Sequence, residues 1–115
     1  MSTEACGQHL IADLHGVAPV RLCDAVALEA LLKESARAAG ATVIFSHFHS
    51  FGEGQGVTGV VLLAESHISV HTWPERGLAA ADIFMCGSAQ AERALDVLRQ
   101  RLSPDSCDVR RIARG

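Results

Sequence analysis

Four segments with β-strand character follow one another closely between residues 42 and 85. They are rich in β-branched, aliphatic or aromatic residues and cover residues 42–48, 57–63, 68–73 and 79–85. Parallel neighbours need a crossover of a dozen or more residues, so strands joined by such short connections must pair antiparallel. The chain is therefore predicted to be built around an antiparallel sheet.

Apolar residues at helical spacing predict two helices outside this region. Asp24 is suited to cap the first helix and Gly40 to end it, while Ser88 is suited to cap the second helix, which Pro104 follows. The positions that share one helix face are Leu28, Leu31, Leu32, Ser35 and Ala39 in the first helix and Ala91, Leu95, Leu98 and Leu102 in the second.

Segments 9–14 and 107–113 have strand character as well, so the predicted order is strand, helix, four strands, helix, strand. Helices that cover one face of an antiparallel sheet form an α+β two-layer sandwich. We expect this fold as a single domain over residues 1–115, because a chain of 115 residues builds one core. The second face of the sheet must be solvated or covered by a partner.

Composition and charge exclude several classes of protein. With a net charge of −3 and 49% hydrophobic residues, the chain is neither disordered nor a nucleic-acid binder. Its one lysine, Lys33, lies on the polar side of the first predicted helix, which excludes pyridoxal chemistry. No apolar run approaches the roughly 20 residues of a membrane helix. Residues 1–9 have no secretory signal character, so we expect a cytoplasmic protein with reduced cysteines.

Histidine, cysteine and acidic residues are concentrated between His47 and Cys86. His47 and His49 share one strand face, as do His67 and His71, but with no HExxH motif and no cysteine pair we expect no metal. A cysteine hydrolase would pair Cys86 with His71 and an oxyanion hole, which nothing in the local sequence marks. In its apolar run, Cys86 is more simply interpreted as a buried residue.

One motif in this region is long and ordered: residues 65–75 read Glu-Ser-His-Ile-Ser-Val-His-Thr-Trp-Pro-Glu. It closely resembles the self-processing site of prokaryotic S-adenosylmethionine decarboxylases, which make a pyruvoyl group from their own serine. The resemblance also includes residues 7–14, 39–42, 48–49, 56–60 and 79–87. Together these segments cover most of residues 7–103.

The resemblance implies self-cleavage into a β chain, residues 1–65, and an α chain, residues 66–115. Ser66 would attack the carbonyl carbon of Glu65 and convert the peptide bond into an ester. Elimination and hydrolysis would then leave a pyruvoyl group at position 66, and His71 would assist this processing.

The resemblance implies roles for further residues in processing and in the decarboxylation of S-adenosylmethionine, which supplies the aminopropyl donor for spermidine and other polyamines. Thr58 would support processing with its hydroxyl, where the family usually has serine. The ketone would condense with the substrate amine and withdraw electrons as CO2 leaves. Cys86 would return a proton. Glu75 would bind the ribose hydroxyls, and Phe51 and Trp73 would offer aromatic surface to the adenine or sulfonium.

Two loops depart from the family's pattern. Turn 52–55 is one residue longer and lacks the common proline, and residues 76–78 lack the usual aromatic side chains. Two alternatives therefore stay open. The chain could be a pyruvoyl-dependent decarboxylase of a basic amino acid such as arginine or ornithine, or an unprocessed paralogue that serves as an interaction subunit.

The position of Ser66 relative to His71 sets a structural condition. Strict strand alternation puts the two side chains on opposite faces, so we expect a turn or bulge near residues 65–67 that brings both to one site. The resemblance further implies a homodimer of αβ units, whose sheets face each other in an αββα arrangement.

Overall fold

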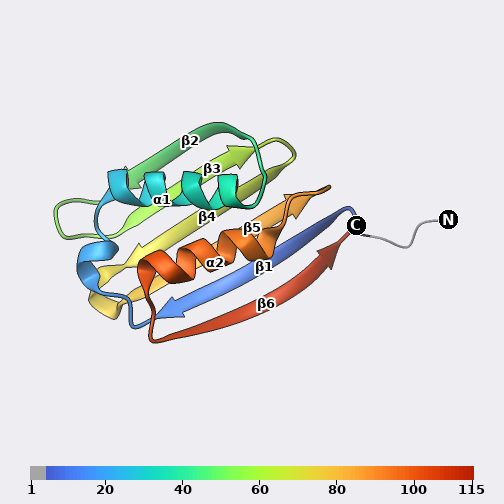
Figure 1. Ribbon diagram of the computed structural model, residues 1–115. Coiled ribbons are helices and arrows are strands. Elements are labelled where there is room, and N and C mark those ends of the chain that lie inside the picture. Colours follow the sequence, from blue (N-terminus) through green and yellow to red (C-terminus); the bar gives the residue numbers. More distant parts are fainter. Residues whose placement is uncertain (1–4) are drawn as a thin grey trace.

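The computed structural model describes residues 5–115, in which two helices and a six-stranded sheet form two layers (Figure 1). The strands are β1 (Gly7–His15), β2 (Val43–Ser50), β3 (Val57–Leu63), β4 (Ser66–Trp73), β5 (Leu78–Cys86) and β6 (Ser106–Arg114). The helices are α1 (Ala25–Ala38) and α2 (Ala91–Leu102), with short 3-10 turns η1 (Pro19–Arg21) and η2 (Pro74–Arg76). The expectation that residues 1–9 have no secretory signal character concerns, in part, residues 1–4, which lie outside the described residues. None of the described helices is long and apolar enough to cross a membrane.

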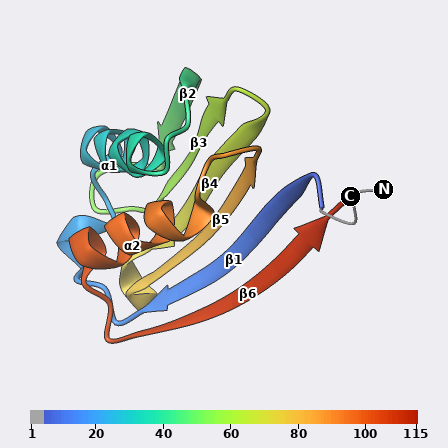
Figure 2. The ribbon, with the colours of Figure 1, turned by 45° about the vertical axis from the view of Figure 1, so that its right-hand side comes forward.

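The strands pair antiparallel throughout, in the order β2-β3-β4-β5-β1-β6. The first strand, β1, therefore lies between β5 and β6, two strands from the C-terminal part of the chain (Figure 2). Both helices cover the same face of the sheet in the two views. The expected α+β sandwich with an antiparallel sheet is confirmed.

The core lies between the sheet and the helices, because every second side chain of each central strand points into this layer. Its fully buried members include Leu10, Leu14, Ile68, Ile83 and Met85 from the sheet and Leu28, Leu32, Leu95 and Leu98 from the helices. Burying a side chain of this size stabilises the fold by about 2 kcal/mol. The alternate side chains lie on the other face of the sheet, which neither α1 nor α2 covers and which we call the open face.

The open face carries all six histidines of the chain, because they occupy alternate positions of β1, β2 and β4. Pairing aligns its side chains in rows across the sheet. One row consists of Phe45, Leu62, His67, Phe84, His9 and Ile112. Phe45 is 57% exposed and Leu62 is 44% exposed, so large apolar side chains and titratable groups are mixed on this surface.

The predicted helix ends agree with the structure at α1 and differ at α2. Asp24 caps α1, and its side chain accepts a hydrogen bond from the Ala27 amide at 3.0 Å. Gly40 follows the helix with a φ of 83°, which glycine adopts without strain. The prediction for Ser88 was wrong: Gln90 is the N-cap residue of α2 and makes no side-chain capping bond. An intervening turn delays the start of this helix beyond Ser88.

Of the turn or bulge expected near residues 65–67, a turn is present at residues 64–65. It does not bring Ser66 and His71 to one face of the sheet, so that part of the prediction was wrong. The ladder of β3 and β4 is regular from the pair Leu63–Ser66 to the pair Thr58–His71. A tight turn at residues 64–65 completes the chain reversal, so regular pairing can begin at once with Ser66. The pairing of β2 with β3 contains a register shift instead, between Val43 and Phe45 of β2.

Gly56, just before β3, permits a close backbone approach. A Cβ atom at this position would overlap the carbonyl oxygen of Thr72, which is main chain and cannot rotate away. We expect Gly56→Ala to lower the free energy of unfolding by about 2 kcal/mol, measured by urea titration. Gly54→Ala is the control variant. A Cβ atom at residue 54 would have no neighbouring atom within 4 Å, but the φ of this residue is positive, so the loss of stability in this variant measures backbone strain alone. An equal loss in both variants would contradict the overlap.

Candidate active site

The turn between β3 and β4 contacts Cys86 at the end of β5. The backbone amide of Cys86 donates a hydrogen bond to Ser66 Oγ at 3.2 Å, and its thiol donates to the carbonyl oxygen of Glu65 at 3.1 Å. Cys86 is only half-buried, so the interpretation of it as an ordinary core residue was wrong. We call Glu65, Ser66 and Cys86 the hairpin cluster. Cys86 thus contacts both residues of a single peptide linkage, Glu65 through its thiol and Ser66 through its main-chain amide.

Glu65 has a strained backbone at this turn. Its φ is 60°, in the left-handed region that favours glycine and costs other residues about 1 kcal/mol. The carbonyl carbon of Glu65 is bonded to the nitrogen of Ser66, so the serine hydroxyl belongs to the residue next to it. A thiol that donates to the carbonyl oxygen would stabilise negative charge on that oxygen during an attack on the carbon.

A second group of predicted site residues lies at the opposite end of the same hairpin. Thr58 Oγ1 and His71 Nδ1 lie 3.0 Å apart. They line a cavity of about 340 Å³ together with Phe51, Trp73 and Glu75. We call these five residues the pocket cluster. Phe51 is 63% exposed and Trp73 is 39% exposed, so neither aromatic ring is committed to the core and both are free to contact a ligand.

The two clusters do not meet within one chain. Ser66 and His71 are five positions apart on β4, which corresponds to about 16 Å along a strand. Strand alternation also turns the His71 side chain to the open face and the Ser66 side chain to the helix-covered face. The structure therefore brings Cys86 to Ser66, as a shared site requires, but leaves His71 remote.

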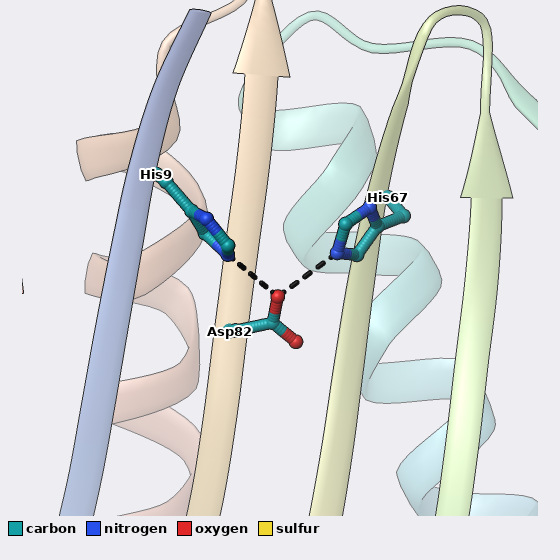
Figure 3. A group of neighbouring side chains, drawn as sticks. All are labelled: His9, His67 and Asp82. Atoms are coloured by element: carbon teal, nitrogen blue, oxygen red, sulfur yellow. Dashed lines mark hydrogen bonds and ion pairs between the residues drawn. The ribbon is translucent and has the colours of Figure 1, made fainter. Parts of the chain in front are cut away.

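A third group lies at the centre of the open face, where His9 and His67 converge on Asp82 (Figure 3). Asp82 Oδ2 accepts hydrogen bonds from Nε2 of His9 at 2.7 Å and from Nε2 of His67 at 2.9 Å. Ser69 donates to the other carboxylate oxygen. These residues come from three neighbouring strands, β1, β4 and β5.

His9, His67 and Asp82 each offer one atom that could bind a metal ion, and these three atoms lie within 4.8 Å of one another. Arg114, however, places its guanidinium 3.0 Å from His9 Nδ1. A guanidinium only donates, so Nδ1 is the acceptor and Nε2 carries the proton that points to Asp82. A metal ligand needs a free lone pair at that nitrogen. The arrangement therefore favours a hydrogen-bonded carboxylate over a metal site. The histidine pairs considered from the sequence, at positions 47 and 49 and at 67 and 71, do not form such a group with each other.

Sequence reasoning missed the roles of Asp82 and His9. A signal for Asp82 was available, because it is the one charged residue in the apolar strand Leu78–Cys86. His9 had no comparable local signal. Its partner is 73 positions away in the chain, and only the insertion of β1 beside β5 brings the two together.

Asp82 stabilises the fold while it is ionised. Burial by itself would raise the pKa of Asp82, but hydrogen bonds from Ser69, His9 and His67 outweigh burial and hold this pKa below its usual 3.8. A carboxyl group with a lowered folded-state pKa contributes stability above its unfolded pKa, and this contribution is lost as the pH falls through the lowered value. We expect the free energy of unfolding to decrease below about pH 4, measured by urea titration across pH. Asp82→Asn should have a lower free energy of unfolding at neutral pH, and this free energy should decrease less than that of the parent as the pH falls. Parallel plots of the free energy of unfolding against pH for the two proteins would contradict this role of Asp82.

Comparison with known proteins bears on these clusters. The family model of S-adenosylmethionine decarboxylase matches residues 8–115. The S-adenosylmethionine decarboxylase proenzyme of Hydrogenobaculum sp. is 46% identical over 110 residues, which span 95% of this chain and 81% of that protein. The proenzyme of Parasynechococcus marenigrum is 50% identical over 97 residues, covering 84% of this chain and 75% of that protein.

A solved structure is similar over nearly the whole chain. The crystal structure of the adenosylmethionine decarboxylase from Aquifex aeolicus superimposes with a TM-score of 0.91 at 41% sequence identity, covering 98% of this chain and 93% of that one. Fold, sequence and family model agree: the chain belongs to the S-adenosylmethionine decarboxylase family.

Proposed function

We propose that this chain is a self-processing proenzyme that decarboxylates S-adenosylmethionine with a pyruvoyl group made from Ser66. The observation that carries the proposal is the double contact of Cys86 with the Glu65–Ser66 linkage, through its thiol and its amide. The family membership of the chain supports the same activity. The product is the aminopropyl donor for polyamine synthesis, and we place the enzyme in the cytoplasm.

Processing would use the geometry of the hairpin cluster. Ser66 Oγ attacks the carbonyl carbon of Glu65 while the Cys86 thiol donates to the carbonyl oxygen, and the C–N bond breaks to leave an ester and a free amine on residue 66. Loss of the Cα proton of residue 66 then breaks its Cβ–Oγ bond. The oxygen departs in the new carboxylate of Glu65. Water replaces the amine nitrogen of residue 66, which leaves as ammonia, and residue 66 becomes a ketone.

The surroundings of residue 66 fit such a group. The position lies at the start of β4 beside Cys86, whose thiol is half-exposed and able to carry a proton. A ketone at this position would supply an electron sink for the loss of CO2 from the substrate. Cys86 would then return a proton to the substrate carbon. Glu75, Phe51 and Trp73, which line the pocket cluster, would hold the ribose and the adenine or sulfonium.

We propose that the active site is assembled from two copies of the chain in a homodimer. Within one chain, Ser66 and His71 lie about 16 Å apart because they are at opposite ends of the same hairpin. If two open faces pack against each other with their strands reversed, the pocket cluster of one copy approaches the Glu65–Ser66 turn of the other. The Ser66 side chain, which points to the helix-covered face in the single chain, would then have to turn toward the open face to meet His71 of the second copy. Covering the open face would also bury Phe45 and Leu62, which are exposed in the single chain.

Release of CO2 from carboxyl-labelled substrates tests the proposal. We expect release from S-adenosylmethionine and none from arginine or ornithine, because the relatives at 40–50% identity are S-adenosylmethionine decarboxylase proenzymes. Release from a basic amino acid alone would overturn the substrate assignment. No release from any of the three, with the chain still intact, would favour the unprocessed paralogue.

A further inference from the structure

Residue 66 would lose two attachments when the chain is cut. In the intact chain it is bonded to Glu65, and its Oγ accepts a hydrogen bond from the Cys86 amide. The cut removes the bond to Glu65, and Oγ departs with the Glu65 carboxylate, so the contact with Cys86 through Oγ is lost as well. Residue 66 keeps its main-chain pairing with Leu63 of β3, and a side chain that fixes the keto carbon must act through the next residue, His67.

His67 has a hydrogen-bond partner and two ring contacts, one of them with the edge of the His9 ring at a centroid distance of 6.0 Å. Its Nε2 lies 2.9 Å from Asp82 Oδ2, and its ring stacks on Phe84 with the centroids 5.9 Å apart and the planes at 24°. Ser69 donates to the second oxygen of Asp82 and so fixes the carboxylate. We call His67, Ser69, Asp82 and Phe84 the clamp. All four belong to residues 66–115, so a cut before residue 66 leaves the clamp intact.

We propose that Asp82 is a positioning residue that, through His67, holds the keto carbon of residue 66 in the orientation that the reaction with S-adenosylmethionine needs. The inference rests on the proposed function. His67 is bonded directly to residue 66, so a rotation of His67 displaces the reacting carbon. A displacement of about 1 Å at a reacting centre can lower a rate on the order of 100-fold.

His9 provides a matched control for this role. Its Nε2 lies 2.7 Å from the same Asp82 oxygen, and its ring contacts Phe84 edge-on at 5.6 Å. It belongs to β1, however, and no covalent link joins it to residue 66 after the cut. Removing either histidine takes one donor from the same oxygen. Loss of His9 also removes an edge contact with the His67 ring, but it leaves the hydrogen bond between His67 and Asp82 in place, whereas loss of His67 removes that bond next to the keto carbon.

The experiment compares three variants of the full chain: His67→Leu, which lacks the donor, His67→Gln, whose amide can still donate to Asp82, and His9→Leu. Intact mass gives the extent of processing, and steady-state kinetics separates kcat from KM. We expect His67→Leu to be fully processed but to lose kcat at least about tenfold with KM within about threefold. His67→Gln should recover most of the loss. His9→Leu should stay within about threefold of the parent.

A readout that does not depend on turnover is the reaction of the native ketone with phenylhydrazine, followed by absorbance. We expect the rate to change in His67→Leu and to stay near that of the parent in His9→Leu, because only the first frees residue 66. If the parent is cleaved and active but His67→Leu keeps its kcat, or His67→Gln is as slow as His67→Leu, the positioning role is overturned while the proposed function stands. If the parent is never cleaved, both are overturned.

Discussion

Ser66→Ala is expected to remain a single chain of 12.2 kDa and to release no CO2 from S-adenosylmethionine. The substitution removes the one oxygen that can attack the Glu65 carbonyl from the adjoining residue and later leave in the new carboxylate. The thiol of Cys86 still donates to that carbonyl, but stabilising charge on an oxygen does not replace a missing nucleophile. Mass spectrometry of the denatured protein measures this directly: the parent should give two fragments of about 7 and 5 kDa.

Ser88→Ala is the control for the loss of a hydroxyl. Ser88 is exposed and lies outside the hairpin and pocket clusters, so this variant should be cleaved as completely as the parent. Cleavage of Ser66→Ala at the same bond would show that another group performs the attack. An intact parent chain after long incubation would remove the basis for a pyruvoyl enzyme.

Mixed dimers of Ser66→Ala and His71→Ala chains are expected to regain activity that neither variant has alone. In such a dimer one site combines the Ser66 of the second chain with the His71 of the first, so both functional side chains are present. The other site lacks both. Because one of the two sites in each mixed dimer is complete, activity per mixed dimer should approach half that of the parent.

The fragments in this experiment identify the geometry. Only the His71→Ala chain keeps the serine at position 66, so it alone should be cleaved, and only when mixed with Ser66→Ala chains before processing. Distinct affinity tags on the two chains allow their masses to be followed separately. If each site lies within one chain, the His71→Ala chain stays uncut in the mixture. The proposal of a site shared between two copies would then be wrong.

The strand order along the chain, the antiparallel pairing and the two helices could be predicted from the sequence because each depends on local patterns. Asp24, for example, is followed by apolar residues at helical spacing, and it caps α1 as expected. The proximity of Cys86 to Ser66 was implied by family resemblance, and the structure places the two in contact. The pocket cluster was likewise predicted as residues, though not as a group separated from Ser66.

What sequence reasoning could not supply was the spatial relation between distant strands. A turn or bulge near residues 65–67 was expected because Ser66 and His71 were expected to reach one site. The turn lies at residues 64–65, but the regular ladder after it shows that this chain alone does not bring the two side chains together. The contact between His9 and Asp82 depends on the register of β1 against β5. That register is set by packing over the whole sheet, so no short motif announces it.

The place of β1 in the sheet has a consequence for the fate of a cut chain. Residues 1–65 contain β1, α1, β2 and β3, while residues 66–115 contain β4, β5, α2 and β6. Because β1 lies between β5 and β6, the two pieces are interleaved, and three ladders must break before they separate. Each piece on its own would leave core side chains uncovered. Once apart, the pieces could regain the fold only by meeting again, so the stability of the mature molecule becomes a matter of mass action and rises with its concentration.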